Sequence, residues 1–457
     1  MSDSSFLKPL IRQDQELPED SLYYRFNTAI QAWQVLAVML FFQLVWVAAI
    51  WATGAAANAS KLPLLGLYVL VIGTVVIIIP DIYFLRTAKW VRQRWQLMLI
   101  LFTLLIFGIG IIYAIYQRSW TYDEQYSFES AKIVATQGTA SFFNQYANIE
   151  WLGPQHPPLI PLINGLALRI FGPYLLVLRL VSLVFGFGII LLTYCIGREL
   201  YNKTVGFVAT VLLLSFPLIF RLGTSALTDV QLTFFFCLSL LLIIILSRKA
   251  SMSLAIAIGF VIGVGLLAKY TMVFIFPVIF CYVVLTGNFR RLFPYLFVSG
   301  LVAGTMLFVW LLFAYEAGIL TTQQENIANV NPGWFVTDST GLKWLSNSLL
   351  TKLPSAFGAY NIPLLTLGLA LVLWRRQATD LFLLAWILGI TVILVLTIPD
   401  HRYFMPTFPA MATMMAIWLA AAKPEISTRA IVASLLFAAG ALWLFIDWYR
   451  AAELFIN

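Results

Sequence analysis

Long apolar runs follow one another from Ala32 almost to the C-terminus, separated by short charged stretches. A bilayer core about 30 Å thick needs about 20 apolar residues for a helix to cross it. The runs are continuous and do not alternate polar with apolar positions, so they predict helices and not a barrel. About thirteen transmembrane helices are expected, at residues 32–52, 63–85, 97–116, 174–197, 204–220, 228–247, 251–268, 271–287, 293–315, 355–374, 379–398, 403–422 and 430–448.

The short basic loops predict the orientation. Lys and Arg residues of the N-terminal tail and of every second connection fall on one side of this arrangement, which the positive-inside rule assigns to the cytoplasm. Residues 1–31 are then a cytoplasmic tail, 32–448 one transmembrane domain, and 449–457 a short external tail. Two long loops, 117–173 and 316–354, face outward. Residues 1–31 lack the pattern of a cleaved signal peptide, so we expect the first span to act as an uncleaved anchor.

Composition supports an integral, multi-pass membrane protein. Hydrophobic residues make up 61% of the chain and charged residues 11%, and the mean hydropathy is +0.90. The net charge of +8 reflects topology, and nucleic-acid binding is not implied. All three cysteines lie inside apolar runs, where they indicate small core residues, not a disulfide or a metal site.

Ionisable residues collect on the predicted external face, although carboxylates at a bilayer edge cost free energy unless they are used. The first loop contains the adjacent acids Asp123 and Glu124. Thr121 to Glu124 also fits a capping box, followed by an amphipathic helix to about Thr136 that Gly138 would end. Plain helix capping is therefore an alternative explanation, worth about 0.3 to 1 kcal/mol per acid. One carboxylate could cap while its neighbour points elsewhere.

His156 precedes two prolines, which favour an extended backbone and would hold the imidazole at a defined height. A structural loop residue is the alternative. Residues 159–171 are apolar but too short to span and are bounded by prolines, so we expect an interfacial helix.

Three later positions have similar alternatives. Asp229 opens an apolar helix, where capping competes with a functional role. Lys269 marks an external hairpin tip, where snorkelling to the interface is the simpler explanation. Arg402 follows His401 in a tight external turn, where its guanidinium could bind a phosphate through two parallel bonds or remain solvated.

Acids and bases on one face suit displacement of a phosphate leaving group by a hydroxyl. An ordered set of motifs then resembles the protein O-mannosyltransferase and lipid A aminoarabinose transferase branch of the GT-C glycosyltransferases. The resemblance covers most of 117–410, and its motifs are Thr121-Tyr122-Asp123-Glu124, His156-Pro157-Pro158-Leu159, Arg179-Leu180, Gly197-Arg198-Glu199-Leu200-Tyr201, Ala226-Leu227-Thr228-Asp229, and His401-Arg402-Tyr403 followed by Pro406.

This resemblance implies an all-α, GT-C-like bundle with interfacial helices in the first external loop. It further implies an inverting transfer of a sugar from a polyprenyl-phosphate donor to a hydroxyl of a lipid, glycan or protein, on the periplasmic or lumenal face of a bacterial inner or plasma membrane. The residues it points to are Asp123 and Glu124 as catalytic, His156, Lys269, His401 and Arg402 as donor-phosphate contacts, and, more weakly, Tyr122, Glu150, Arg221 and Asp229 as substrate contacts.

The chain departs from the pattern in ways that leave the acceptor open. His156 replaces a lysine often seen before the two prolines, two predicted spans precede the acidic pair's span, and no soluble C-terminal domain is expected. A transporter or flippase of lipid-linked sugars is an alternative, but transporters place ionisable groups near the bilayer midplane and often show repeats. A polysaccharide ligase or polymerase is another.

No cofactor is expected to be required. Adjacent acids could hold Mg²⁺ or Mn²⁺, but the chain has no Asp-x-Asp pair and no tight histidine spacing of the kind zinc sites use.

Overall fold

The structure is a computed structural model that describes residues 123–149, 156–321, 361–396 and 401–420, with Leu152, residues 356–358 and scattered positions between 94 and 120. Over these residues the chain forms helices and the turns between them, with no strand. The predicted spans at 32–52, 63–85 and 430–448, and most of the second external loop, lie outside the described residues.

The described helices follow the predicted spans within a few residues at most ends. They are α5 (Glu124–Asn144), η3 (Tyr146–Asn148), α7 (Leu159–Phe171), α8 (Leu175–Leu200), α9 (Lys203–Leu214), α10 (Pro217–Gly223), α11 (Thr228–Arg248), α12 (Met252–Ala268), η4 (Tyr270–Phe274), α13 (Ile275–Leu285), α14 (Phe289–Glu316), α18 (Ile362–Arg375), α19 (Ala378–Leu396), η7 (His401–Thr407) and α20 (Phe408–Ala420). Of these, α8, α11 and α14 are each long and apolar enough to cross a bilayer. The bent pair α9–α10 would be a fourth span if it is counted as one. The total of about thirteen stays a prediction.

The span predicted at 204–220 is not one straight helix, because the structure bends it at Ser215 and Phe216. Helices α9 and α10 are bent by 73° at this point. Pro217 begins α10 and disfavours helical backbone at the preceding residue, and Phe216 is accordingly extended. The Asn361 side chain donates a hydrogen bond to the Ser215 hydroxyl at 3.0 Å, which ties the break to the start of α18.

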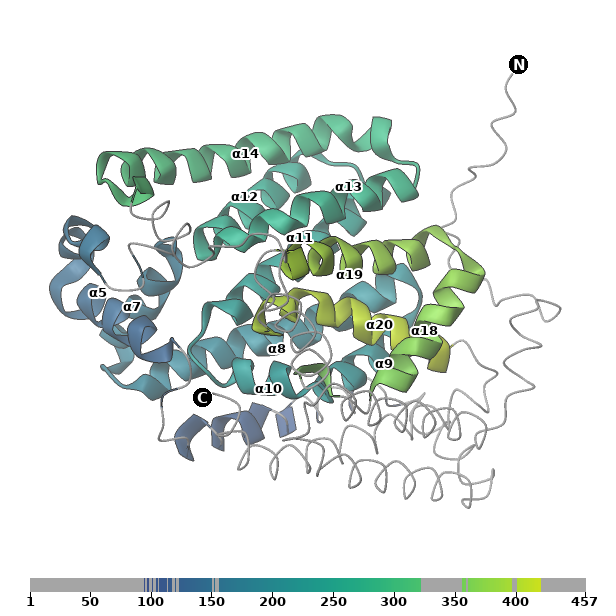
Figure 1. The fold of residues 1–457 in the computed structure, drawn as a ribbon, viewed down its shortest axis with the longest axis horizontal. Helices are drawn as coiled ribbons and strands as arrows, with labels where there is room; N and C mark the ends of the chain where they lie inside the picture. Colours follow the sequence, from purple (N-terminus) through teal and green to yellow (C-terminus); the bar gives the residue numbers. More distant parts are fainter. Residues whose placement is uncertain are drawn as a thin grey trace, which may run out of the picture.

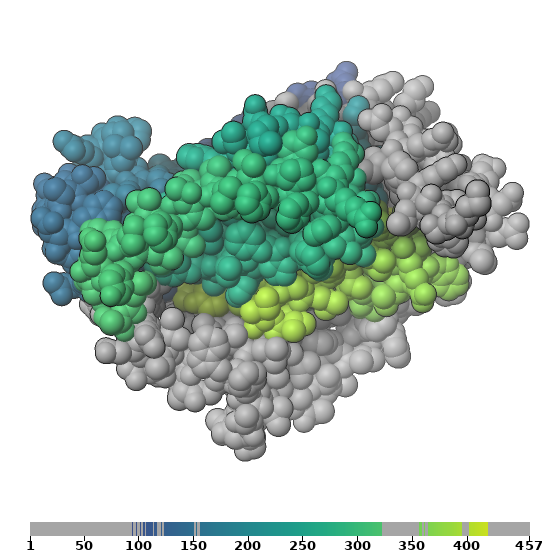
Figure 2. Space-filling view, turned by 90° about the horizontal axis from the view of Figure 1, so that it is seen from above, coloured from purple at the N-terminus to yellow at the C-terminus, as the bar shows by residue number. Residues whose placement is uncertain are grey.

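The long helices lie side by side, and α5 and α7 pack against each other at one end of the bundle, at the left of Figure 1. Helix α8 contacts α9 and α11, and α12 contacts α11 and α14. A Cβ added to Gly197 would come within 2.8 Å of the Gly206 Cα, so α8 and α9 touch backbone to backbone, as small residues allow in membrane bundles. Figure 2 shows α14 crossing one face and reaching the α5–α7 unit.

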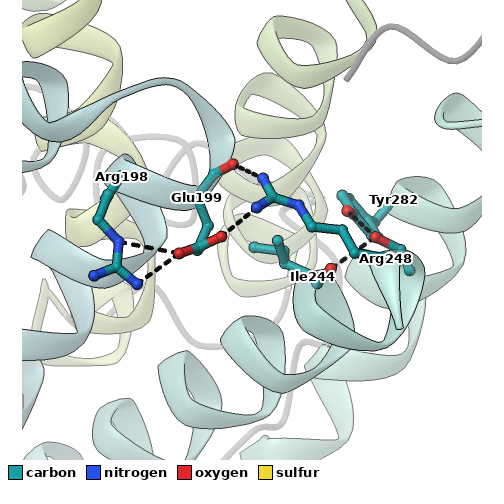
Figure 3. A network of polar contacts seen from close by, with 6 residues as sticks. Arg198, Glu199, Ile244, Arg248 and Tyr282 are labelled. Atoms are coloured by element: carbon teal, nitrogen blue, oxygen red, sulfur yellow. Dashed lines mark hydrogen bonds and ion pairs between the residues drawn. The ribbon is translucent and has the colours of Figure 1, made fainter. Parts of the chain in front are cut away.

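The other end of the bundle carries its own ion pairs, which we call the Arg248 end. Glu199 accepts hydrogen bonds from Arg198 beside it and from Arg248 at the end of α11, as Figure 3 shows. Nearby, Asp380 accepts a bond from the Tyr201 hydroxyl at 2.8 Å and lies 3.1 Å from the Arg375 guanidinium. Apart from Asp380, which is near the start of the span predicted at 379–398, these residues come from loops that the sequence assigned to the cytoplasm.

Helix α5 is fixed to the bundle by a buried ion pair. Glu124, its first residue, accepts bonds from Arg179 of α8 at 2.8 and 2.7 Å, one on each carboxylate oxygen. The Ala226 amide donates to the same carboxylate at 2.9 Å, and Arg179 donates to the Ala114 carbonyl at 3.3 Å. Both charged side chains are fully buried. The pair therefore joins four segments of the chain and sets where α5 begins.

Replacing Glu124 with Ala should destabilise the fold by about 3–5 kcal/mol, because the Arg179 charge stays buried without its carboxylate. Thermal unfolding in detergent measures this change. The matched control is Glu129→Ala on the same helix, where Glu129 is exposed and 3.8 Å from Lys132; its effect should be within about 0.5 kcal/mol. Equal effects of the two variants would contradict the role given to the buried pair.

Candidate functional site

Asp123, the residue before α5, lies beside Arg402 of η7. The Asp123 Oδ2 atom is 2.8 Å from the Arg402 Nη1 atom, and the two side chains are 29% and 14% exposed. Asp123 makes no side-chain bond to the α5 backbone. Helix capping therefore does not account for this carboxylate, which is partly open to solvent and held by a residue distant in the sequence.

A second ion pair lies between Asp229 and Lys269. Asp229 is in the first turn of α11 and Lys269 follows the end of α12, and their Oδ1 and Nζ atoms are 2.6 Å apart. Both side chains are buried. The snorkelling explanation for Lys269 is wrong, because its ammonium group is directed to a buried carboxylate.

Tyr403 lies between the two cations. The Lys269 Nζ atom is 4.3 Å from the centroid of its ring, and the Arg402 Cζ atom is 5.2 Å from the same centroid. An aromatic face attracts such cations. Asp123, Arg402, Tyr403, Lys269 and Asp229 thus form one continuous set, which we call the polar chain. Sequence reasoning assigned no role to Tyr403, although it quoted the residue in the Arg-Tyr motif.

His156 is positioned by its backbone. Its amide donates to the Leu152 carbonyl at 3.0 Å, and its own carbonyl accepts a bond from the Tyr146 hydroxyl at 2.6 Å. Burial lowers the pKa of the His156 imidazole well below its ordinary value, and the charges of Lys269 and Arg402 lower it further. The imidazole is therefore neutral at pH 7, in contrast to the basic residue that the resemblance implied.

Aromatic side chains fix the first loop against the bundle. The Tyr146 and Trp310 ring centroids are 5.1 Å apart, and the Trp310 indole donates to the Tyr270 hydroxyl at 2.9 Å. Burial and, next, the neighbouring Tyr270 raise the pKa of Tyr146, so its phenol remains a hydrogen-bond donor. Because Tyr270 directly follows Lys269, these contacts connect the His156 loop to the turn that carries the Lys269 ammonium.

The other predicted residues are less informative. Glu124 is buried, and its oxygens contact Arg179 and Ala226 in the ion pair described above. Arg221 is buried on α10. His401 begins η7, but its side chain is not among the described parts, and Tyr122 and Glu150 lie outside the described residues. Roles for these five in chemistry or substrate binding stay predictions.

The polar chain has the parts needed for a displacement at a phosphate-linked centre. Asp123 is exposed enough to accept a proton from a hydroxyl. Arg402 and Lys269 supply fixed positive charge for a developing oxyanion, and guanidinium suits phosphate in particular. These groups lie next to the start of α5, in the first turn of α11, next to the end of α12 and in η7, so the site forms only when the bundle is assembled.

The chain is similar to several known proteins. Residues 155–313 match the family model described as dolichyl-phosphate-mannose-protein mannosyltransferase. Comparison with curated proteins finds no match. The fold matches ArnT from Cupriavidus metallidurans bound to undecaprenyl phosphate, with a TM-score of 0.57 and 16% identity over 74% of this chain and 62% of that one. It also matches the Archaeoglobus fulgidus oligosaccharyltransferase tethered to an acceptor peptide, with a TM-score of 0.50 and 16% identity over 77% and 56% of the two chains.

The chain thus spans about three fifths of the length of the ArnT structure. The apolar helices and these matches make it an integral, multi-pass membrane protein. The predicted resemblance is confirmed at the level of fold: residues 155–313 match the dolichyl-phosphate-mannose-protein mannosyltransferase family model, and the chain shares its fold with the ArnT and oligosaccharyltransferase structures.

Proposed function

We propose that this protein is a glycosyltransferase that moves a sugar from a polyprenyl-phosphate donor to a hydroxyl acceptor. The observation that carries the proposal is the Asp123 carboxylate, partly exposed and 2.8 Å from the Arg402 guanidinium. The polar chain contains a second cation, Lys269, which forms an ion pair with Asp229. A proton acceptor beside two cations suits attack by a hydroxyl on a carbon that is bonded to phosphate.

The reaction is a single inverting displacement. Asp123 accepts the proton of the acceptor hydroxyl as its oxygen forms a bond to the anomeric carbon. The bond between that carbon and the phosphate oxygen breaks, and the phosphate departs with the electron pair. Lys269 and Arg402 stabilise this charge. His156 lies close enough to both cations for their charges to lower its pKa. No step needs a metal ion, and metal independence remains part of the proposal.

The comparisons support the donor class more than the acceptor. One matched structure, ArnT, is bound to undecaprenyl phosphate. Another, the oligosaccharyltransferase, is tethered to an acceptor peptide. An acceptor is therefore associated with only one of these two structures. We therefore propose a monophosphate-linked polyprenyl donor and leave the acceptor as a lipid, glycan or protein hydroxyl.

The polar chain also favours an enzyme over a transporter of lipid-linked sugars. Its members lie at helix ends, at the start of α11 and the end of α12, and not at mid-helix positions. Substrate sites of transporters lie near the bilayer midplane. A ligase would instead require a diphosphate-linked glycan as donor. We further propose that the Asp123 end faces the periplasm or lumen and that the Arg248 end faces the cytoplasm.

Replacing Asp123 with Asn should lower the transfer rate by at least about 100-fold, because the amide does not accept the acceptor proton. The measurement is turnover of the purified, reconstituted protein with monophosphate-linked polyprenyl sugars. Glu129→Gln, an exposed substitution on the same helix, is the control and should keep full activity. Near-native turnover of Asp123→Asn would exclude Asp123 as the base.

Donor binding should become tighter as the pH falls below about 6.5, the ordinary pKa of an imidazole. His156 is neutral in the free protein because burial and two cations lower its pKa. A bound phosphodiester offsets those cations and raises the pKa, so binding takes up a proton, and acid favours it. Titration of a nonhydrolysable donor analogue at several pH values measures the effect. The dependence should vanish in His156→Gln, and a flat profile in the parent protein would place His156 away from the phosphate.

A further inference from the structure

Arg402 is the one member of the polar chain that serves both halves of the proposed reaction. Its Nη1 atom holds the Asp123 carboxylate at 2.8 Å. Its Cζ atom is 5.2 Å from the centroid of the Tyr403 ring, and the Lys269 ammonium approaches that ring at 4.3 Å. The guanidinium thus lies between the proton acceptor and the second cation proposed to bind phosphate.

Charge is balanced over the polar chain before substrate arrives. Asp123 and Asp229 carry two negative charges, and Lys269 and Arg402 carry two positive charges. A phosphodiester donor adds one negative charge. During transfer Asp123 becomes neutral as it gains the acceptor proton, while the departing phosphate changes from a monoanion to a dianion. The total charge stays constant, but one negative charge moves from Asp123 to the phosphate.

We propose that the Arg402 guanidinium changes partner in this step, leaving Asp123 and binding the departing phosphate. The inference rests on the proposed function. Protonation of Asp123 removes the charge that holds Arg402, at the moment when an equal charge appears on the leaving oxygen. Arg402 thereby couples the two bond changes: proton transfer to Asp123 releases the cation that stabilises the breaking carbon–oxygen bond.

Lys269 is not equivalent to Arg402 in this respect. Its partner Asp229 is 2% exposed, whereas Asp123 is 29% exposed. A buried carboxylate that is out of reach of an acceptor hydroxyl does not gain the proton, so the Lys269 pair persists through the reaction. Tyr403 contacts both cations and gives Arg402 a fixed surface along which to turn.

The test is a double-mutant cycle on phosphate binding, with the full chain in nanodiscs at pH 8. The probe is a short-chain polyprenyl phosphate, and the variants are Asp123→Asn, Arg402→Ala and the two combined. If Asp123 and the phosphate compete for Arg402, Asp123→Asn frees the guanidinium and should tighten binding by about tenfold, the size of one charge-assisted contact. Arg402→Ala should weaken binding, and adding Asp123→Asn to it should restore less than about threefold.

Two outcomes would overturn the exchange. Unchanged affinity in Asp123→Asn would mean that Arg402 binds phosphate without leaving the carboxylate. If Asp123→Asn raised the affinity for phosphate equally with and without Arg402, Asp123 would act only by repelling the anion. Absence of transfer by the parent protein with every monophosphate donor, despite the predicted binding cycle, would instead reject the proposed function and leave only the competition between Asp123 and phosphate for Arg402.

Discussion

A charge placed among apolar helices has to be paired, and the Glu124–Arg179 pair meets this requirement at the point where the first loop joins the bundle. Breaking such a pair on one side leaves a buried charge, which costs far more than the pair itself contributes. Glu124 also accepts a hydrogen bond from the Ala226 amide, and Arg179 donates one to the Ala114 carbonyl. Since Asp123 directly precedes Glu124, the position of the proposed base follows from this buried contact.

Exposure distinguishes the buried ion pairs, which hold helices together, from the pair that is proposed to take part in the reaction. Glu124 is fully buried, Asp229 is 2% exposed and Asp123 is 29% exposed. A buried ion pair resists a change of protonation or partner, because either change leaves an unpaired charge in a medium of low polarity. A partly exposed pair is weaker and is open to substrate. The three carboxylates therefore suit different roles, although they are the same chemical group: Glu124 and Asp229 suit a structural role, and Asp123 suits the proposed role of base.

The sequence predicted the helices well because apolar length and proline positions are local properties. It placed α8, α11 and α12 within about three residues at each end, and it identified α7 as too short to span. It missed the bend before Pro217, although the proline is visible, because apolar length alone was used there. Asp123, Lys269 and Arg402 were selected correctly as neighbours on one face, because ionisable residues are rare in such a chain.

What the sequence did not predict depends on contacts between distant segments. Glu124 and Arg179 are 55 positions apart, and nothing in either motif says that they pair. Tyr403 was unassigned because an aromatic residue in an apolar chain is ordinary until two cations are found on its ring. His156 was expected to contact the donor phosphate, at a position where related proteins often have a lysine, but its surroundings could not be predicted: burial, and then the charges of Lys269 and Arg402, lower the pKa of the imidazole. A neutral imidazole leaves the two acids and two bases of the polar chain balanced in charge, whereas a third cation at this position would leave the site positive.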